Sequence, residues 1–209
     1  MTSEFKSRVM TVMTVLLLLT AGIAGCTSSG PATQVPAASP APAQKLSTVA
    51  PAEMALQPSD LPAGFVLLEK GDRNISEMRS WSLEHGWKGG YFAAYQKQDG
   101  TASSGIIIDQ ALSVYPAENI TLIVPDTLQL VKNWADEDRA NRSVEDDPSL
   151  PSIGDFSRGM KLSDKNDEPP EYVIVFSKQD VYMELYTNGT AADYATLKNL
   201  AGVAEAKIR

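Results

Sequence analysis

The chain has one histidine, and this restricts the chemistry that its side chains can perform. A Ser–His–Asp triad would have to use His85 as its base. No G-x-S-x-G turn, which would present a serine nucleophile, occurs in the sequence. His85 precedes Gly86 near the expected end of a helix, where an imidazole interacts favourably with the helix dipole. The sequence therefore predicts no catalytic residue, and a zinc or copper site is not expected either.

Acidic runs are the remaining candidates for cation chemistry, because calcium requires only oxygen ligands. Three such runs occur, at 136–138, 145–147 and 164–168. None matches the D-x-[DN]-x-[DN]-G loop, so we interpret them as solvated charge and predict no metal and no cofactor. Calcium binding stays an alternative, as does an exported carboxylate-dependent hydrolase. Such a hydrolase needs two carboxylates that converge in one cleft.

Aromatic side chains are concentrated in the stretch WSLEHGWKGGYFAAY, residues 81–95. Aromatic residues with polar handles favour binding surfaces. The candidate ligand-binding residues are Trp81, Trp87, Tyr91 and Tyr95. In a strand the two tyrosines share one face, so burial beneath a covering helix is the alternative interpretation.

The single cysteine, Cys26, follows an uncharged apolar run that begins after Arg8. A basic start, an apolar centre and small residues at the end are typical of an export signal. The run is at the short limit for a helix that spans the bilayer's ~30 Å core. No basic residues follow it directly, which favours a cleaved signal over residues 1–25.

The segment Ile23-Ala24-Gly25-Cys26 resembles the lipobox of prokaryotic lipoproteins. The resemblance implies that Cys26 is lipidated and becomes the first residue of the mature chain. The protein would then be extracytoplasmic and anchored to the outer face of the cell membrane, with the membrane as its first partner. An ordinary secreted protein and an uncleaved N-terminal anchor are the alternatives.

The next segment, residues 26–55, is rich in alanine, proline, serine and threonine. It has too few large apolar residues to offset the cost of ordering, so we predict a disordered linker. Residues 56–209 have the length of one domain. The whole chain has a net charge of −8, which argues against a nucleic-acid partner because such a partner requires a basic surface.

Four N-x-S/T sequons indicate a glycosylated exterior. They begin at Asn74, Asn119, Asn141 and Asn188. Such an exterior suits an archaeal envelope. The alternative is that these asparagines only favour turns next to Ser and Thr.

Hydrophobic periodicity predicts an α+β domain, an antiparallel sheet of about six strands with helices packed on it. The expected strands are 65–70, 91–97, 105–115, 156–162, 172–177 and 181–186, and the last two form a hairpin. The expected helices are 76–85, 126–139 and 191–208. The last helix has an apolar stripe suited to covering the sheet.

The two ends of this domain, LQPSDLPAGF and YVIVFSKQDVYMELYTNGTAADYATLKNLAGVAEAKI, resemble uncharacterised cell-surface lipoproteins of methanogenic archaea. They resemble more distantly the mycobacterial exported lipoprotein and sensor domains, which share an α/β/α sandwich with the photosystem II subunit PsbP. The resemblance implies binding or scaffolding outside the cell and transfers no catalytic residue. We therefore expect a membrane-anchored domain that binds a small molecule or an envelope protein, and no enzyme. A structural envelope protein is a further alternative.

Overall fold

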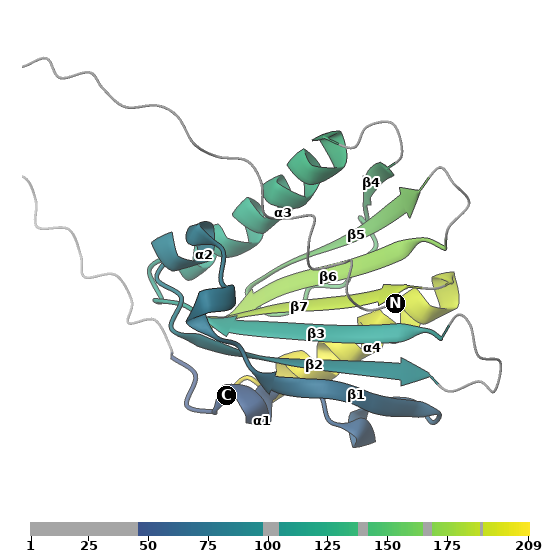
Figure 1. The fold of residues 1–209 in the computed structure, drawn as a ribbon, viewed down its shortest axis with the longest axis horizontal. Coiled ribbons are helices and arrows are strands. Elements are labelled where there is room, and N and C mark those ends of the chain that lie inside the picture. The colour runs from purple at the N-terminus through teal and green to yellow at the C-terminus, as the bar shows by residue number, and fades with distance from the viewer. Residues whose placement is uncertain (1–45, 98–104, 138–141, 165–168, 189) are drawn as a thin grey trace, which may run out of the picture. The chain divides into compact units, whose positions relative to one another are not determined.

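The computed structural model describes residues 46–97, 105–137, 142–164, 169–188 and 190–209. The predicted signal sequence, Cys26, most of the linker and Asn141 lie outside the described residues. Figure 1 shows an antiparallel sheet of seven strands in the order β1-β2-β3-β7-β6-β5-β4. The strands are β1 (Phe65–Asp72), β2 (Gly89–Lys97), β3 (Ile107–Val114), β4 (Arg142–Asp146), β5 (Phe156–Asp164), β6 (Glu171–Lys178) and β7 (Val181–Asn188). The helices are α1 (Pro51–Met54), α2 (Ser80–Glu84), α3 (Ile120–Glu137) and α4 (Ala191–Lys207), with 3-10 turns η1 (Pro58–Asp60) and η2 (Ile75–Glu77).

Helices pack on both faces of the sheet. On one face, α4 contacts β6 and β7 while α1 contacts β2 and β3; we call this the α4 face. On the other, α3 contacts β4, β5, β6 and β7; we call this the α3 face. The predicted α+β class is thus confirmed, as an α/β/α arrangement with seven strands where about six were expected.

The α4 face holds the larger core. Alternation along β7 points Val181, Met183 and Leu185 to this face, where all three are fully buried. The predicted stripe of α4 packs against them, and its members are all buried: Tyr194, Leu197, Ala201, Ala204 and Ile208. Burying such side chains stabilises the fold by about 1.5–3 kcal/mol each.

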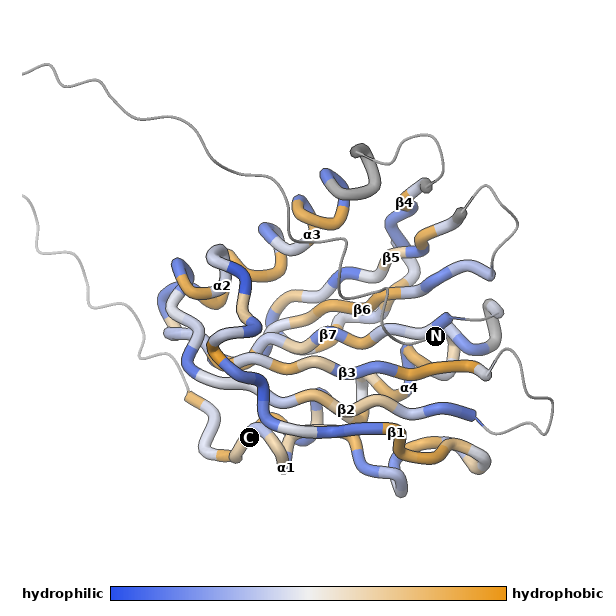
Figure 2. Tube along the Cα trace, viewed as in Figure 1, coloured by the Kyte–Doolittle hydropathy of each residue, from blue (hydrophilic) through white to orange (hydrophobic). Residues whose placement is uncertain are grey.

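The outer strand β1 differs from the central strands. Figure 2 shows a hydrophilic stretch next to a hydrophobic one along β1, whereas β6 is mostly hydrophobic. All six interior positions of β6 are buried, while most of β1 is exposed. An edge strand with one uncovered side does not need continuous apolar sequence, because water solvates its outer groups.

The helix predicted to begin at Asp126 begins at Ile120 instead. The helix thus begins six residues earlier than expected and contains Pro125, a residue that normally interrupts a helix. Pro125 is exposed, so water can solvate the carbonyl that its missing N–H leaves unpaired. Ile120, Ile123 and Val124 are buried beneath this first part of α3 and hold it in place.

Two other expectations were wrong in detail. The helix expected over 76–85 is divided into η2 and α2, and Met78 between them is extended. Strand β4 was not predicted, because its sequence RSVED contains a single apolar residue. It forms at the sheet edge by pairing with β5, where charged residues are tolerated.

The folded domain begins before residue 56. Residues 46–55 were assigned to the linker, yet Met54 and Ala55 are buried in the α4-face core. The backbone N–H of Thr48 donates to the Arg209 carbonyl at 2.9 Å, which joins the two ends of the domain. The short apolar sequence MAL was too brief to indicate a helix, but it provides enough apolar surface to pack between α4 and the sheet.

Candidate functional site

The four aromatic candidates do not form one site. Tyr95 is buried on the α4 face, and its hydroxyl donates to the Leu56 carbonyl, while Tyr91 packs on the same core. Trp81 and Trp87 pack against the core of the opposite face. The structure thus assigns Tyr95 to the core and separates it from both tryptophans by the sheet.

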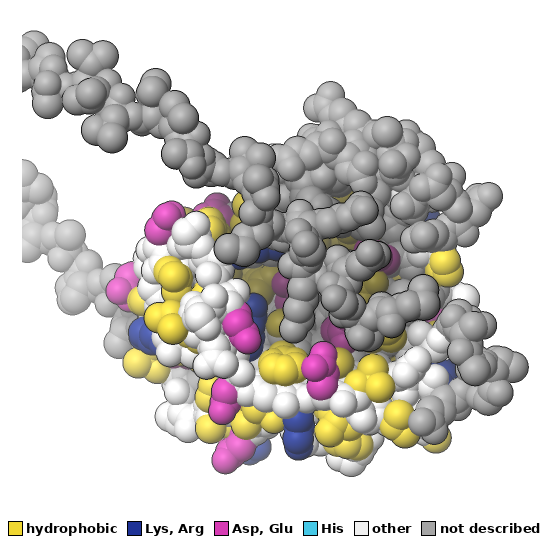
Figure 3. All heavy atoms as spheres, viewed as in Figure 1, with side chains coloured by type: hydrophobic (Ala, Val, Ile, Leu, Met, Phe, Trp, Pro, Cys, Tyr) yellow, Lys and Arg dark blue, Asp and Glu magenta, His cyan; other side chains and the backbone are white. Residues whose placement is uncertain are grey.

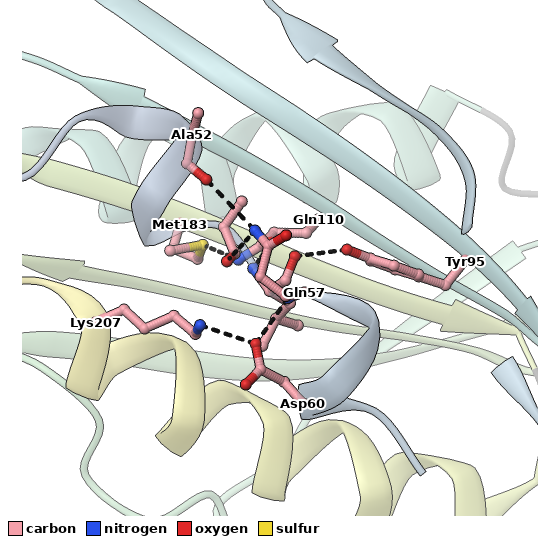
Figure 4. Close-up of polar contacts among 9 residues, drawn as sticks. Ala52, Gln57, Asp60, Tyr95, Gln110, Met183 and Lys207 are labelled. Carbon is pink, nitrogen blue, oxygen red and sulfur yellow. Dashed lines mark hydrogen bonds and ion pairs between the residues drawn. The ribbon is translucent and has the colours of Figure 1, made fainter. Parts of the chain in front are cut away.

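The LQPSDLP segment is held under α4 by polar contacts (Figure 4). The Gln110 Oε1 atom accepts from the Leu56 N–H at 2.7 Å, and Gln110 Nε2 lies 2.8 Å from the Met183 sulfur. Asp60 pairs with Lys207 at 2.8 Å. Burial opposes the ionised form of Asp60, but the hydrogen bonds from Lys207 and from the Gln57 N–H, together with the Lys207 charge, lower its pKa. Each polar group finds its partner within the fold, so these residues stabilise the domain.

His85 joins α2 to α3. Its Nε2 atom lies 3.1 Å from an oxygen of Asp126, and its Nδ1 atom lies 2.9 Å from the Trp81 carbonyl at the end of α2. In the described part of the chain, no hydrogen bond joins this imidazole to a serine hydroxyl. His85 therefore lies at the helix end that the sequence indicated, and its contacts join two helices.

The sequon asparagines differ in accessibility. Asn74 is exposed, just before η2. Asn119 donates to the His85 carbonyl at 3.0 Å, and the Asn188 side-chain oxygen accepts from the Ile107 N–H at 2.8 Å. Of the three described sequons, Asn74 offers the most accessible acceptor for a glycan.

The α3 face is covered over only part of the sheet. Since α3 contacts β4 to β7, the area over β1, β2 and β3 has no helix packed on it among the described residues. We call this area, with the adjoining side chains of β7, the bare face. It contains a shallow hollow with a volume of about 200 Å³. In Figure 3, acidic side chains stand next to hydrophobic ones over β1 and β2.

Strand register brings the hollow's side chains together. Asp109 on β3 lies between Ala94 of β2 and Tyr186 of β7. Two residues further on, Ala111 lies between Phe92 and Glu184. Small alanine side chains between large aromatic ones create the depression. The side chains around it are Glu69, Phe92, Ala94, Asp109, Ala111, Glu184 and Tyr186.

A β-bulge places Glu69 on this face. Leu67 pairs with Tyr95 and Glu69 pairs with Ala94, so Leu68 is the extra residue. In a regular strand Leu68 would occupy the position opposite Ala94, and Glu69 would point to the α4 face. Bulges commonly redirect side chains at functional sites. Here the bulge turns a carboxylate toward the hollow.

Negative charges lie close together around the hollow. Burial, followed by the charges of Glu69 and Glu184, raises the pKa of Asp109 to about 6. Within the described ranges, no lysine or arginine forms an ion pair with any of these three carboxylates. Glu184 instead accepts a hydrogen bond from the Tyr182 hydroxyl at 3.1 Å.

One guanidinium reaches the α2 end of the same face. Arg73 Nη1 donates to the Ser113 hydroxyl at 3.0 Å, and the Trp87 indole N–H donates to the same oxygen at 3.1 Å. Arg73 therefore offsets part of the negative charge without pairing directly with a carboxylate. The bare face retains a net negative charge.

The acidic run at 145–147 is paired with lysines. Asp147 pairs with Lys198 at 2.7 Å, and Asp146 pairs with Lys132 at 3.0 Å. Within the described ranges, no group of three or more His, Cys, Asp or Glu side chains has a geometry that could hold a metal ion. The run at 136–138 lies where side chains are not described, and 165–168 lies outside the described residues.

The sequence did not indicate the residues of the hollow. Their one visible signal is Asp109 within the apolar stretch GIIIDQALSVY, because a charged residue in a central strand is costly to bury. Glu69 reaches the hollow only because of the bulge, which the sequence does not show. Glu184 reaches it only because β7 pairs with β3, a pairing between distant strands.

No protein-family model matches the chain, and a comparison with curated proteins finds no match. None of the helices described here is long and apolar enough to cross a membrane.

Proposed function

We propose that the protein is a membrane-anchored extracytoplasmic lipoprotein whose α+β domain binds a ligand on the bare face. Cys26 carries the lipid, and the following residues connect it to the domain. The resemblance to methanogen cell-surface lipoproteins supports the same placement. The observation that carries the binding role is the hollow, where carboxylates and aromatic rings converge on a face that no helix of the described residues covers.

The chemistry of the hollow favours binding over structural support alone. Carboxylates placed side by side in a partly buried hollow destabilise the folded state unless a ligand compensates their charge. Groups with shifted pKa values in a concave site are candidates for function. Asp109 meets this description, with its pKa raised to about 6.

An exported carboxylate-dependent hydrolase is the second candidate. Asp109 and Glu184 are diagonal neighbours on paired strands, at an expected Cα separation of about 7–8 Å. A raised pKa suits a general acid. Against this, the hollow of about 200 Å³ is smaller than the pockets of about 300–1,000 Å³ that enclose most ligands.

Mass spectrometry of the membrane-extracted protein tests the anchor. The proposal predicts a mature chain that begins at Cys26 with lipid attached, and loss of that mass in a Cys26→Ser variant. Retention of residues 1–25 in the native protein would refute the cleavage.

Fragment screening by NMR on the full chain tests the binding role. A mixture of cationic, neutral and anionic fragments should shift backbone amides of β1, β2, β3 and β7 on the bare face. Filling the hollow with Ala111→Leu should abolish these shifts, whereas Ala206→Leu, on the exposed side of α4, should leave them unchanged. Fragment binding confined to other surfaces, or none at all, would contradict the proposal.

A further inference from the structure

We propose that the bare face binds a small organic ammonium ion, with its cationic head among Glu69, Asp109 and Glu184 and its apolar body on Phe92 and Tyr186. This inference rests on the proposed function of the bare face and specifies the chemical class of its ligand. It follows from charge, from the apolar surface and from size.

The carboxylates of the hollow differ in their partners from other carboxylates of the domain. Two other carboxylates of the domain pair with lysines, Asp60 with Lys207 at 2.8 Å and Asp147 with Lys198 at 2.7 Å. The buried Asp180 instead accepts a hydrogen bond from the Ser47 N–H at 2.8 Å. Among the described residues, no lysine or arginine pairs with a carboxylate of the hollow. Glu184 accepts a hydrogen bond from the neutral Tyr182 hydroxyl, and Glu69 is exposed. Attraction between opposite charges is stronger in a partly desolvated hollow than in water. The hollow therefore complements a positive charge supplied from outside the chain.

The apolar surface distinguishes an organic cation from a metal ion. In the part of the chain that is described, these three carboxylates do not form a metal-binding group. They are distributed over β1, β3 and β7, and neighbouring strands lie about 4.8 Å apart. Ala94 lies between Glu69 and Asp109, and Ala111 lies next to Glu184. A body of several carbon atoms can contact this surface while its head remains near a carboxylate.

The aromatic rings add an attraction that is specific for cations. An ammonium group over an aromatic face gains about 0.5–1 kcal/mol at exposed sites and about 2 kcal/mol when desolvated. The Phe92 ring is held against Gly71, where an added Cβ atom would lie 3.2 Å from the ring's Cε1 atom. Tyr186 borders the opposite side of the hollow on β7. The Phe92 ring thus lies close to the Gly71 backbone, at the edge of the hollow.

Size limits the ligand to a small molecule. The volume of about 200 Å³ accommodates an alkylammonium of a few carbon atoms. It is too small to enclose an oligosaccharide or a large heterocycle. An alkylammonium of this size would neutralise part of the negative charge of the hollow.

Titration of the full chain with matched probes tests the inference. Butylammonium, butan-1-ol and butyrate share an alkyl body and differ in charge, and NMR shifts with isothermal calorimetry report the site and the affinity. We expect butylammonium to shift amides of the bare face and to bind at least tenfold more tightly than butan-1-ol. Butyrate should not bind there. Choline serves as a second cation with a bulkier head.

Variants separate charge recognition from folding. Asp109→Asn and Glu184→Gln should each weaken butylammonium binding about five- to twentyfold while the NMR spectrum retains the pattern of a folded domain. Glu84→Gln, which removes an exposed charge from α2, should leave the affinity unchanged. Equal binding of butylammonium and butan-1-ol, or unchanged affinity in both hollow variants, would overturn the inference. A neutral or anionic fragment that binds the bare face more tightly than butylammonium would overturn the inference while preserving the proposed function. No binding there by any probe would overturn both.

Discussion

Gln110 and Asp109 are neighbours on β3 that point to opposite faces of the sheet, and their surroundings differ. Gln110 is almost fully buried, and both ends of its amide contact groups of the fold. Asp109 is partly exposed, has an elevated pKa and lies near two further carboxylates. The polar groups of the α4 face thus stabilise the fold, whereas those of the bare face oppose one another. A surface that reduces stability in this way is typical of a functional site.

Matched phenylalanine truncations should show the largest difference between the two faces. Phe176 is fully buried in the α4-face core, so Phe176→Ala should lower the free energy of unfolding by about 3–5 kcal/mol. Phe92 borders the open hollow, and Phe92→Ala should cost about 1 kcal/mol, since its site is already partly solvated. Urea denaturation measures both values. Equal losses would mean that the bare face is as tightly packed as the core.

Removing the Gln110 amide should have the next largest effect. Gln110→Leu keeps the apolar stem but leaves the buried Leu56 N–H without its acceptor. An unsatisfied buried donor costs about 1–3 kcal/mol, so the variant should unfold at a lower urea concentration. A stability equal to that of the unmodified protein would show that the contacts in Figure 4 are dispensable.

Removing the Asp109 charge should raise the stability of the fold, unlike the two changes above. The pKa of about 6 in the folded state exceeds the unfolded value of about 3.9. The folded state therefore holds this proton more tightly, and the associated stability is fully present below about pH 4 and is lost as pH rises through about 6. Asp109→Asn should raise the free energy of unfolding at pH 8 by about 1 kcal/mol, a value reduced for solvent screening.

The free energy of unfolding, measured between pH 4 and pH 8, checks whether Asp109→Asn raises stability as predicted. The Asn variant should show a flatter profile than the unmodified protein across that range, and Glu84→Gln should not. Destabilisation of Asp109→Asn at pH 8 would show that the carboxylate has a stabilising partner.

The smallest effect on stability should come from Gly71→Ala. Gly71 lies on the edge strand, and the added methyl group would contact the Phe92 ring at 3.2 Å. A small ring movement can relieve this contact, so stability should change by about 0.5 kcal/mol or less. Butylammonium affinity should nevertheless fall several-fold, because the ring no longer borders the hollow in the same position. Unchanged affinity would remove Phe92 from the proposed site.

The sequence predicted the elements whose side chains follow a regular period. The β6–β7 hairpin and the stripe of α4 were both expected, because their apolar residues recur with the spacing of a covered strand and a covering helix. The start of α3 was missed because tertiary packing of Ile120 and Ile123 outweighs the presence of Pro125. Strand β4 was missed because pairing with β5 determines it more than its own composition.

The candidate site was the least predictable part. The composition of the aromatic stretch, residues 81–95, predicted a binding site there. The structure instead divides its aromatic side chains between the two faces of the sheet. The hollow depends on three features that a single sequence does not display: the bulge at Leu68, the pairing of β3 with β7, and the length of sheet that α3 leaves uncovered. Pairing between distant strands is a property of the whole fold.

The side-chain pKa of Asp109 is the most direct test of the central claim, which is that uncompensated carboxylates make the bare face a cation-binding surface. Carbon-detected NMR of the carboxyl group in the full chain can follow this pKa with and without butylammonium. We predict a pKa of about 6 in the free protein and a lower value when the cation is bound, because the positive charge favours the ionised form. An ordinary pKa near 4 that does not move with butylammonium would contradict the account.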